Sequence, residues 1–490
     1  MKRDLASCAN QCFDILIIGG GIFGAGVARD AALRGLRVAL IDKGDFACGT
    51  SSRSSKLIHG GFRYLEQFAF GLVAEACRER QVLQTIAPHL VHPQPFLFPV
   101  YKGDPRSLVK LRVGMTMYDL MSRSHNVSRH QALSTECTLT KEPALARSGM
   151  RGSVLFYDCQ EDDARLCIET ISHAAHCGAV CNNYCELTGF IVRENRITAA
   201  RLTDQLGSGE NFEIAARVFI NAAGPWVQSV AKLSPIKSSD IGLSPTKGVH
   251  VLLPRLTQQH AIAFQSQRDG RIMFIIPWGD CSIVGTTDTD WHGDPTEVRA
   301  EPADVEYLLH EVRSILPDSP VKLSDVITTF AGVRALMRSD KSNPSNRPRE
   351  HRVMQHGENL LSIVGGKYTT HRAIAQEVVV RICELLGQDC PPCLTATTAF
   401  PQCRPTHSGQ RISIVPNVFA SDITHACEDE MAMTVSDVMR RRTSLALSKH
   451  GEPETAASVA KLMVAPMRWS NEQMNQSLQE YVEEWKRALP

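Results

Sequence analysis

The stretch Phe13-Asp-Ile-Leu-Ile-Ile-Gly-Gly-Gly-Ile-Phe-Gly24 decides the fold of this chain. The apolar run inside it is long enough for a buried strand but too short for a helix of its own. Residues 25–34, which follow the glycines, have the composition of a helix, and Gly35 ends it. A second apolar run covers residues 37–41. The stretch therefore predicts a βαβ unit with its glycines at the first strand-to-helix turn.

Each glycine of this turn has a separate task in such a unit. Gly19 permits a tight turn, Gly21 lets a pyrophosphate approach the backbone, and Gly24 lets the helix pack closely on the strand. The free N–H groups at the helix N-terminus then face the phosphates. Asp42 follows the second strand, where a carboxylate accepts hydrogen bonds from an adenosine ribose. We predict a dinucleotide site, which the motif alone assigns neither to FAD nor to NAD.

The composition bounds the class of protein. A chain of 490 residues suggests about three domain-sized units, and a net charge of +1 gives no global field that would attract nucleic acid. The sixteen cysteines are scattered, which favours reduced thiols in a cytosol-facing protein over a disulfide framework. The first residues lack an apolar signal core, and no run of about 18 apolar residues exists. We expect no membrane-spanning segment, and peripheral attachment stays open.

A polar segment, residues 50–65, follows the βαβ unit. It mixes small hydroxyl residues with Lys56, His59, Arg63 and Tyr64 around a pair of glycines. A simple polar loop does not explain why two cations, an imidazole and a phenol gather there. Such a segment can lie against a planar cofactor and offer hydrogen-bond donors to an anion.

Further strands end in residues suited to the same crevice. One runs through residues 217–221 into Ala222-Ala-Gly-Pro-Trp226, and another, residues 327–334, ends in Arg334. Residues 361–372 repeat the opening design, with a strand, a glycine turn and a helix from about Thr369 to Leu386. The carboxyl ends of parallel strands share one edge of a sheet, so we expect these segments to meet there.

Several helical segments are expected, and two of them allow a second interpretation besides packing. The first helix, over residues 66–90, is expected to break at His92-Pro-Gln-Pro95 and has no second interpretation. The next, Leu108 to Met121, is rich in Leu, Val and Met with basic flanks, so it is either core or a surface helix that docks on anionic lipid. Residues 427–490 are expected to be mostly helical. The run Arg440-Arg-Arg442 is then a solvated face, a lipid contact or an interdomain contact.

The pair Cys390-x-x-Cys393 marks a boundary rather than a metal centre. The chain has no second such pair and no histidine cluster near it. A zinc site needs such further ligands, so we interpret the two thiols as linker cysteines, with a redox or metal-binding pair as the alternative, and predict no metal site.

The chain resembles the FAD-dependent, quinone-linked glycerol-3-phosphate dehydrogenases over residues 12–390. The most specific segment is Ser54-Ser-Lys-Leu-Ile-His-Gly-Gly61 followed by Arg63-Tyr64. The motifs that carry the resemblance, in chain order, are Ile17-Ile-Gly-Gly-Gly-Ile-Phe-Gly-Ala-Gly26, Thr50 to Glu66, Met117-Tyr-Asp119, Asp162-Asp-Ala-Arg-Leu166, Asn221-Ala-Ala-Gly-Pro-Trp226, Ile276-Pro-Trp278, Gly285-Thr-Thr-Asp288, Gly332-Val-Arg334, and Gly365-Gly-Lys367 with Thr369 and Thr370.

The resemblance implies an α/β fold: a glutathione-reductase-like (Rossmann) FAD-binding domain, a β-rich substrate cap and a C-terminal helical domain. The expected boundaries are 12–70, 150–235 and 325–388 for the FAD domain, 71–149 and 236–324 for the cap, and 395–490 for the helical domain. The residues expected to bind FAD are Gly19, Gly21, Gly24, Asp42, Thr50, Ser51, Ser52, Ser54, Gly60, Ala223, Gly224, Asp288, Gly366, Lys367 and Thr369.

The implied reaction is oxidation of sn-glycerol 3-phosphate to dihydroxyacetone phosphate, with hydride transfer from C2 to N5 of FAD and electron transfer to a ubiquinone-type acceptor. The implied location is the inner face of the cytoplasmic membrane, as a peripheral protein, and a homodimer stays open. Arg63, Tyr64, Arg334 and Lys367 are expected to bind the substrate. Arg334, Lys367 and His59 are the expected catalytic residues.

The chemistry asks for the same residue types. A phosphate dianion needs Arg forks or Lys charges, and the alcohol must also lose a proton to a base. Either His59 or Lys367 can be that base, and the sequence leaves the choice open. Two sites depart from the family pattern, and both are expected beside the pocket: one has Ala335 in place of Pro, and the other has Tyr368 in place of Leu and His371 in place of Tyr.

Three other functions would also use a dinucleotide site. One is an oxidase of a related hydroxy or amino acid that uses O₂, although the cations suit a phosphate better than an amino acid. The second is a flavoprotein sensor without turnover, which the retained cations disfavour. The third is an NAD dehydrogenase, in which segments 50–64 and 365–372 would have no use.

Overall fold

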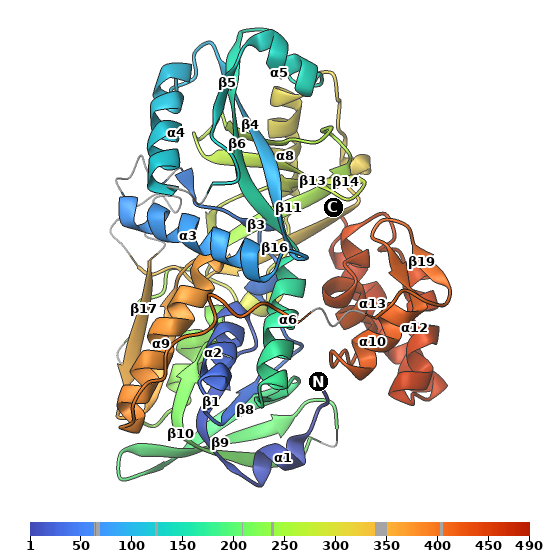
Figure 1. Cartoon of the computed structure of the whole chain (residues 1–490). Coiled ribbons are helices and arrows are strands. Elements are labelled where there is room, and N and C mark those ends of the chain that lie inside the picture. Colours follow the sequence, from blue (N-terminus) through green and yellow to red (C-terminus); the bar gives the residue numbers. More distant parts are fainter. Residues whose placement is uncertain are drawn as a thin grey trace.

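The computed structural model describes residues 1–62, 64, 69–122, 126–207, 209–236, 240–338, 350–401 and 405–490. Figure 1 shows one sheet with its helices at the bottom, a second sheet with its helices at the top, and a helical C-terminal part beside both. Among the described residues, no helix is both long and apolar enough to cross a membrane.

The first sheet contains the opening βαβ unit and has eight strands in the described part of the chain: β1 (Cys12–Ile18), β2 (Val38–Ile41), β7 (Val180–Asn182), β8 (Cys185–Arg193), β9 (Arg196–Asp204), β10 (Asn211–Asn221), β17 (His351–His356) and β18 (Leu360–Gly365). The main order is β17-β18-β10-β1-β2-β7, and β18, β10, β1, β2 and β7 run parallel. This confirms the parallel βαβ unit predicted from the glycine turn.

Helices cover one face of this sheet, and β8, β9 and the short helix α1 (Leu5–Ala9) cover the other. On the first face lie α2 (Ile22–Leu33), α6 (Asp163–His176) and α9 (His371–Leu386). Ile15 and Ile17 of β1 pack toward these helices, while Leu16 and Ile18 pack in the cluster formed with β8 and β9. Because both faces of β1 are covered, its apolar residues run continuously instead of alternating.

The second sheet has ten strands in the described part of the chain, mostly antiparallel: β3 (Leu57–Ile58), β4 (Val91–Tyr101), β5 (Gln131–Leu133), β6 (Met150–Glu161), β11 (Thr246–Pro254), β12 (Ala261–Gln265), β13 (Ile272–Trp278), β14 (Cys281–Gly285), β15 (Thr289–Asp290) and β16 (Thr328–Arg334). Residues of α8 (Pro302–Ile315) join one core cluster on this sheet. Residues of α3 (Phe70–Ile86) and α4 (Leu108–Ser122) join another. The short α5 (Thr135–Lys141) packs against β6.

The break expected at His92-Pro-Gln-Pro95 is wrong. Helix α3 ends at Ile86, and β4 already begins at Val91, so both prolines lie inside a strand. Proline has no N–H for a ladder, but β12 pairs with β4 only at Phe96 and Leu97. The edge of β4 at the prolines therefore needs no partner on that side.

The boundaries between the FAD domain and the cap remain a proposal, and the pairing of the strands changes where we place them. Strands β3, β6 and β16 were expected in the FAD domain, and each of them pairs within the second sheet. We therefore propose that, at residues 57–58, 150–161 and 328–334, the chain passes from the FAD domain into the second sheet. These crossings bring residues of both sheets to one cavity.

The C-terminal part is mostly helical, as predicted. It holds β19 (Arg411–Ser413), β20 (Val418–Phe419), α10 (Ala420–Glu428), α11 (Val435–Asp437), a π-helical turn (Val438–Arg442), α12 (Pro453–Met467) and α13 (Asn471–Arg487). The expectation that Arg440–Arg442 form a solvated face or a lipid contact is wrong for two of the three. Arg441 and Arg442 are buried and bind Asp45, which lies in the loop after β2 of the first sheet. This run therefore makes an interdomain contact.

Candidate active site

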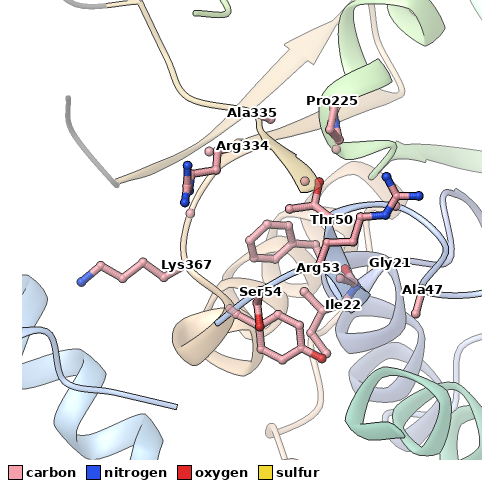
Figure 2. Close-up of a pocket in the computed structure, with 18 of the residues that line it drawn as sticks. Gly21, Ile22, Ala47, Thr50, Arg53, Ser54, Pro225, Arg334, Ala335 and Lys367 are labelled. Carbon is pink, nitrogen blue, oxygen red and sulfur yellow. The ribbon is translucent and has the colours of Figure 1, made fainter. Parts of the chain in front are cut away.

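A cavity of about 800 Å³ is lined by residues of both sheets. Its walls include the ends of β1, β2 and β16 and the polar segment that follows β2. Figure 2 shows Gly21, Ile22 and Ala47 on one side of this cavity and Arg334 and Lys367 on another.

The glycine turn forms the first end of the cavity. Gly19 has φ of +111°, and a Cβ there would lie 2.6 Å from the carbonyl oxygen of Ala222. A Cβ on Gly24 would lie 1.9 Å from the carbonyl oxygen of Gly19, so this glycine serves helix packing and does not line the cavity. Gly21 lines it at the start of α2, and a Cβ there would approach only the Ser51 hydroxyl, at 3.1 Å. The turn thus leaves room for phosphates at the helix N-terminus.

Asp42 lies beside this turn, as predicted. Its carboxylate accepts hydrogen bonds from the backbone N–H of Gly20 at 2.6 Å and of Gly44 at 2.9 Å. Burial raises the pKa of Asp42 to about 6. Asp42 lines the cavity, where hydroxyl groups of a ribose can donate to the carboxylate.

Most of the expected hydroxyl residues line the cavity. The Thr50 hydroxyl donates to the carbonyl oxygen of Val333 at 2.6 Å, and the Ser51 hydroxyl accepts from the Ile22 N–H at 2.9 Å. Ser54 also lines it. Ser52 does not line it, and its carbonyl oxygen accepts a hydrogen bond from the buried ammonium of Lys56 at 2.9 Å.

Further predicted contacts come from the other strand ends. Ala223 and Gly224 line the cavity after β10, and Gly366 lines it after β18. Gly366 has φ of +91°, and a Cβ there would lie 2.8 Å from the Phe23 ring. Gly60 is different, because a Cβ there would lie 2.2 Å from the Tyr118 hydroxyl oxygen. Gly60 therefore serves packing and does not line the cavity.

The expected substrate cations lie together on the cavity wall. Arg334 donates from Nη1 to Asp288 at 3.2 Å and from Nη2 to the Thr286 hydroxyl at 3.0 Å. Asp288, expected to bind FAD, thus holds the Arg334 guanidinium in place. The Lys367 ammonium lies 3.7 Å from the centre of the Tyr64 ring, within cation–π range.

His59 lines the cavity near the second glycine turn. Its backbone N–H donates to the Thr369 hydroxyl at 3.2 Å, which joins the two segments predicted to contact the cofactor. Thr369 lines the cavity as well. Arg63, expected at the substrate, lies outside the described residues.

Sequence analysis missed His250, which β11 places in the cavity wall. Its Nε2 lies 2.8 Å from the Ser55 hydroxyl oxygen, and its ring stacks on Phe330 with centroids 4.7 Å apart. Burial, together with the charge of Arg334, lowers the pKa of His250 well below its usual value. The available signal was a single histidine inside an otherwise apolar strand, which indicates no role by itself.

Of the three departures from the family pattern, Ala335 and Tyr368 line the cavity. The expectation that His371 lies beside the pocket is wrong. His371 is buried at the start of α9 against α2, where a Cβ on Gly26 would lie 3.3 Å from its ring. Burial lowers the pKa of His371 to about 3, so the ring is neutral and serves packing.

Comparisons with known proteins fit this geometry. The family model of FAD-dependent oxidoreductases matches residues 14–379, and the model of the C-terminal domain of alpha-glycerophosphate oxidase matches residues 361–474. The chain is therefore an FAD-dependent oxidoreductase. It is 34% identical to glycerol-3-phosphate dehydrogenase of Synechocystis sp. over 98% of both chains. It is 37% identical to aerobic glycerol-3-phosphate dehydrogenase of Staphylococcus haemolyticus, over 89% of this chain and 78% of that one. Within its class, the chain belongs to the glycerol-3-phosphate dehydrogenase family.

Solved structures agree. Glycerol-3-phosphate dehydrogenase from Bacillus halodurans, complexed with FAD, superposes with a TM-score of 0.80 at 25% identity, covering 99% of this chain and 97% of that one. The L-alpha-glycerophosphate oxidase of Mycoplasma pneumoniae shares the fold, with a TM-score of 0.61 at 18% identity over 80% of this chain and 99% of that one. FAD fits the cavity because Gly21 leaves it open at the helix N-terminus and Asp42 lies where the ribose is held.

Proposed function

We propose that this chain oxidises sn-glycerol 3-phosphate to dihydroxyacetone phosphate and passes the two electrons to a membrane quinone. The observation that carries the substrate is the pair of cations, Arg334 and Lys367, on a cavity wall that also holds the cofactor contacts. A guanidinium fork and an ammonium supply charge for a phosphate dianion and for the oxygen on C2. The names of the relatives support the same substrate.

The chain's own residues orient the substrate and take its proton. Asp288 and Thr286 fix the Arg334 guanidinium, and the Tyr64 ring supports the Lys367 ammonium. When bound, FAD accepts the hydride from C2 of the alcohol. The hydroxyl proton goes to a base, for which we propose His59, Lys367 or His250. Burial and the charge of Arg334 lower the pKa of His250, which keeps its ring neutral but also opposes the imidazolium that would form if it took the proton.

The test is anaerobic titration of the flavin-loaded protein with sn-glycerol 3-phosphate, following the oxidised flavin band. We expect bleaching by about one equivalent of substrate, and recovery of the band when a quinone analogue is added. A band that persists at high substrate would overturn the proposed substrate. Glycerol, which lacks the phosphate, serves as the matched control and should leave the band unchanged.

A second acceptor, O₂, is favoured by the match of residues 361–474 to a domain of an oxidase. The same reduced protein distinguishes the two acceptors. Rapid recovery of the oxidised band in air, with one hydrogen peroxide per substrate, would identify an oxidase. Recovery with the quinone analogue and slow recovery in air would support the quinone-linked dehydrogenase.

We propose that α4 attaches the chain to the inner face of the cytoplasmic membrane. The exposed fractions of Val109, Val113 and Leu120 are 71%, 58% and 71%, and their spacing places them on one helix face with Met117. Figure 1 draws α4 at the outer edge of the upper part, above α3. The exposed Lys110 and Arg112 flank this face. Such an amphipathic surface suits anionic lipid, where a quinone is dissolved.

Replacing Val113 and Leu120 with serine should weaken binding to anionic vesicles about tenfold or more, because both side chains lose burial in the lipid. Vesicle sedimentation at low and high salt measures this binding, and salt should weaken that of the unaltered protein. Leu323→Ser is the matched control, since Leu323 is an exposed leucine elsewhere. Equal binding by the control and the double variant would contradict a docking role for α4.

A further inference from the structure

A buried charge cluster joins the C-terminal part to the loop that frames the adenosine end of the cavity. Asp45, Arg441 and Arg442 are 2%, 8% and 6% exposed. Arg441 Nε lies 2.5 Å from Asp45 Oδ2, and Arg442 donates from Nη1 and Nη2 to the two carboxylate oxygens at 2.8 and 2.9 Å. Asn183 donates to Oδ1 at 3.0 Å. We call Asp45, Arg441 and Arg442 the clasp.

The clasp is a fixed arrangement. Arg441 also donates to Asp437 at 2.6 Å, and Arg442 also donates to the carbonyl oxygen of Glu430 at 2.9 Å. Although burial alone raises the pKa of Asp45, the guanidinium groups of Arg442 and Arg441 lower it to about 2. The carboxylate therefore stays ionised at neutral pH. Buried charges are stable only when paired and hydrogen-bonded in this way.

The loop that holds Asp45 also contacts the cofactor end of the cavity. Three residues before Asp45 lies Asp42, whose carboxylate accepts from the Gly44 N–H. Ala47, Cys48 and Gly49, which follow Asp45, line the cavity. Ala47 has φ of +61°, an unfavourable conformation for alanine, and its N–H donates to the carbonyl oxygen of Gly20 at 3.0 Å. A loop with such a residue keeps its shape only when its surroundings hold it.

The local sequence cannot supply that support, because the arginines lie almost 400 residues further along the chain. They sit in a π-helical turn, Val438–Arg442, a rare form that is frequent at functional sites. Figure 1 places the C-terminal part beside α6 and the lower sheet's helices.

We propose that Arg441 and Arg442 are positioning residues for the cofactor: through Asp45 they hold the loop 42–49 in the shape that binds the adenosine end of FAD. The C-terminal part thereby controls retention of FAD rather than the redox step. This inference goes beyond the proposed reaction, because it concerns the cofactor and does not depend on the substrate.

The test uses Arg442→Lys in the full chain, which keeps the charge but loses the two-pronged contact. We expect the dissociation constant for FAD to rise about tenfold or more, because hydrogen bonds to a charged group are lost. At saturating FAD, the visible spectrum of the bound flavin should be unchanged, since the clasp does not contact Arg334 or Lys367. Arg440→Gln is the matched control: Arg440 is partly exposed and pairs with Glu484 of the same part of the chain.

Two outcomes would overturn the inference. One is a folded Arg442→Lys protein with the FAD affinity of the unaltered chain, which would reduce the clasp to a structural contact. The other is found without substitution, by hydrogen exchange of the full chain with and without FAD. If the clasp supports the loop, reciprocity requires FAD to slow exchange in residues 434–447. Equal exchange rates with and without FAD would show that the C-terminal part is not coupled to the cofactor site. This outcome would hold even if the variant failed to fold.

Discussion

Arg334→Ala should reduce the rate of flavin reduction by glycerol 3-phosphate by about 10²- to 10³-fold while the flavin stays bound. The guanidinium lies on the cavity wall, held by Asp288 and Thr286, whereas Gly21 lies on another side of the cavity. Its loss removes a charge-assisted fork for the substrate anion but leaves Gly21 and Asp42 in place. Stopped-flow measurement of flavin bleaching, with flavin content determined separately, gives both quantities.

The control for this variant lies four residues further along. Arg338 is exposed and pairs with exposed Asp240, so Arg338→Ala should keep the rate of the unaltered protein. Arg334→Lys keeps a charge near Asp288 and should fall between the two. If Arg334→Ala reduced its flavin as fast as Arg338→Ala, Arg334 would have no part in the substrate site.

Local patterns predicted those parts of the site that each depend on one segment. Each of these parts lies within a few residues of a strand end in the sequence. They are the Gly19–Gly24 turn, the acid at Asp42 and the cation that ends β16. The parallel order of β1, β2, β10 and β18 brings the glycine turn, Asp42 and the turn before Lys367 to one edge of the first sheet, which is a general property of the fold. Arg334 reaches the same cavity from β16 of the second sheet, and its place there was expected from the family resemblance.

Other assignments failed because they depend on partners far along the chain. An apolar strand has the same local pattern in either sheet, so nothing near β6 or β16 shows that they pair in the second sheet. A run of three arginines normally lies in solvent, and nothing in the local pattern shows that Asp45, distant in sequence, pairs with both Arg441 and Arg442 in the interior. His371 belongs to a motif at the site, but its helical position turns it toward α2.

Gly21→Val should give a folded protein that lacks flavin. Gly21 has φ of −80° and ψ of 179°, an extended conformation that valine adopts readily, so the backbone itself does not oppose the substitution. Gly21 lines the cavity, and a Cβ there would have the Ser51 hydroxyl oxygen, at 3.1 Å, as its one neighbour within 4 Å among the described residues. The space that the valine side chain fills is that of the pyrophosphate at the N-terminus of α2.

Gly24, the last glycine of the turn, gives a different expectation, which makes this prediction specific. A Cβ on Gly24 would lie 1.9 Å from the carbonyl oxygen of Gly19, so Gly24→Val should destabilise the fold itself. Gly71→Val is the neutral control, because nothing lies within 4 Å of a Cβ at this exposed position in α3. We expect flavin content below about a tenth of normal for Gly21→Val, with a thermal transition like that of the Gly71→Val apoprotein. A Gly21→Val protein that retained its full flavin would show that the phosphates do not bind at this turn.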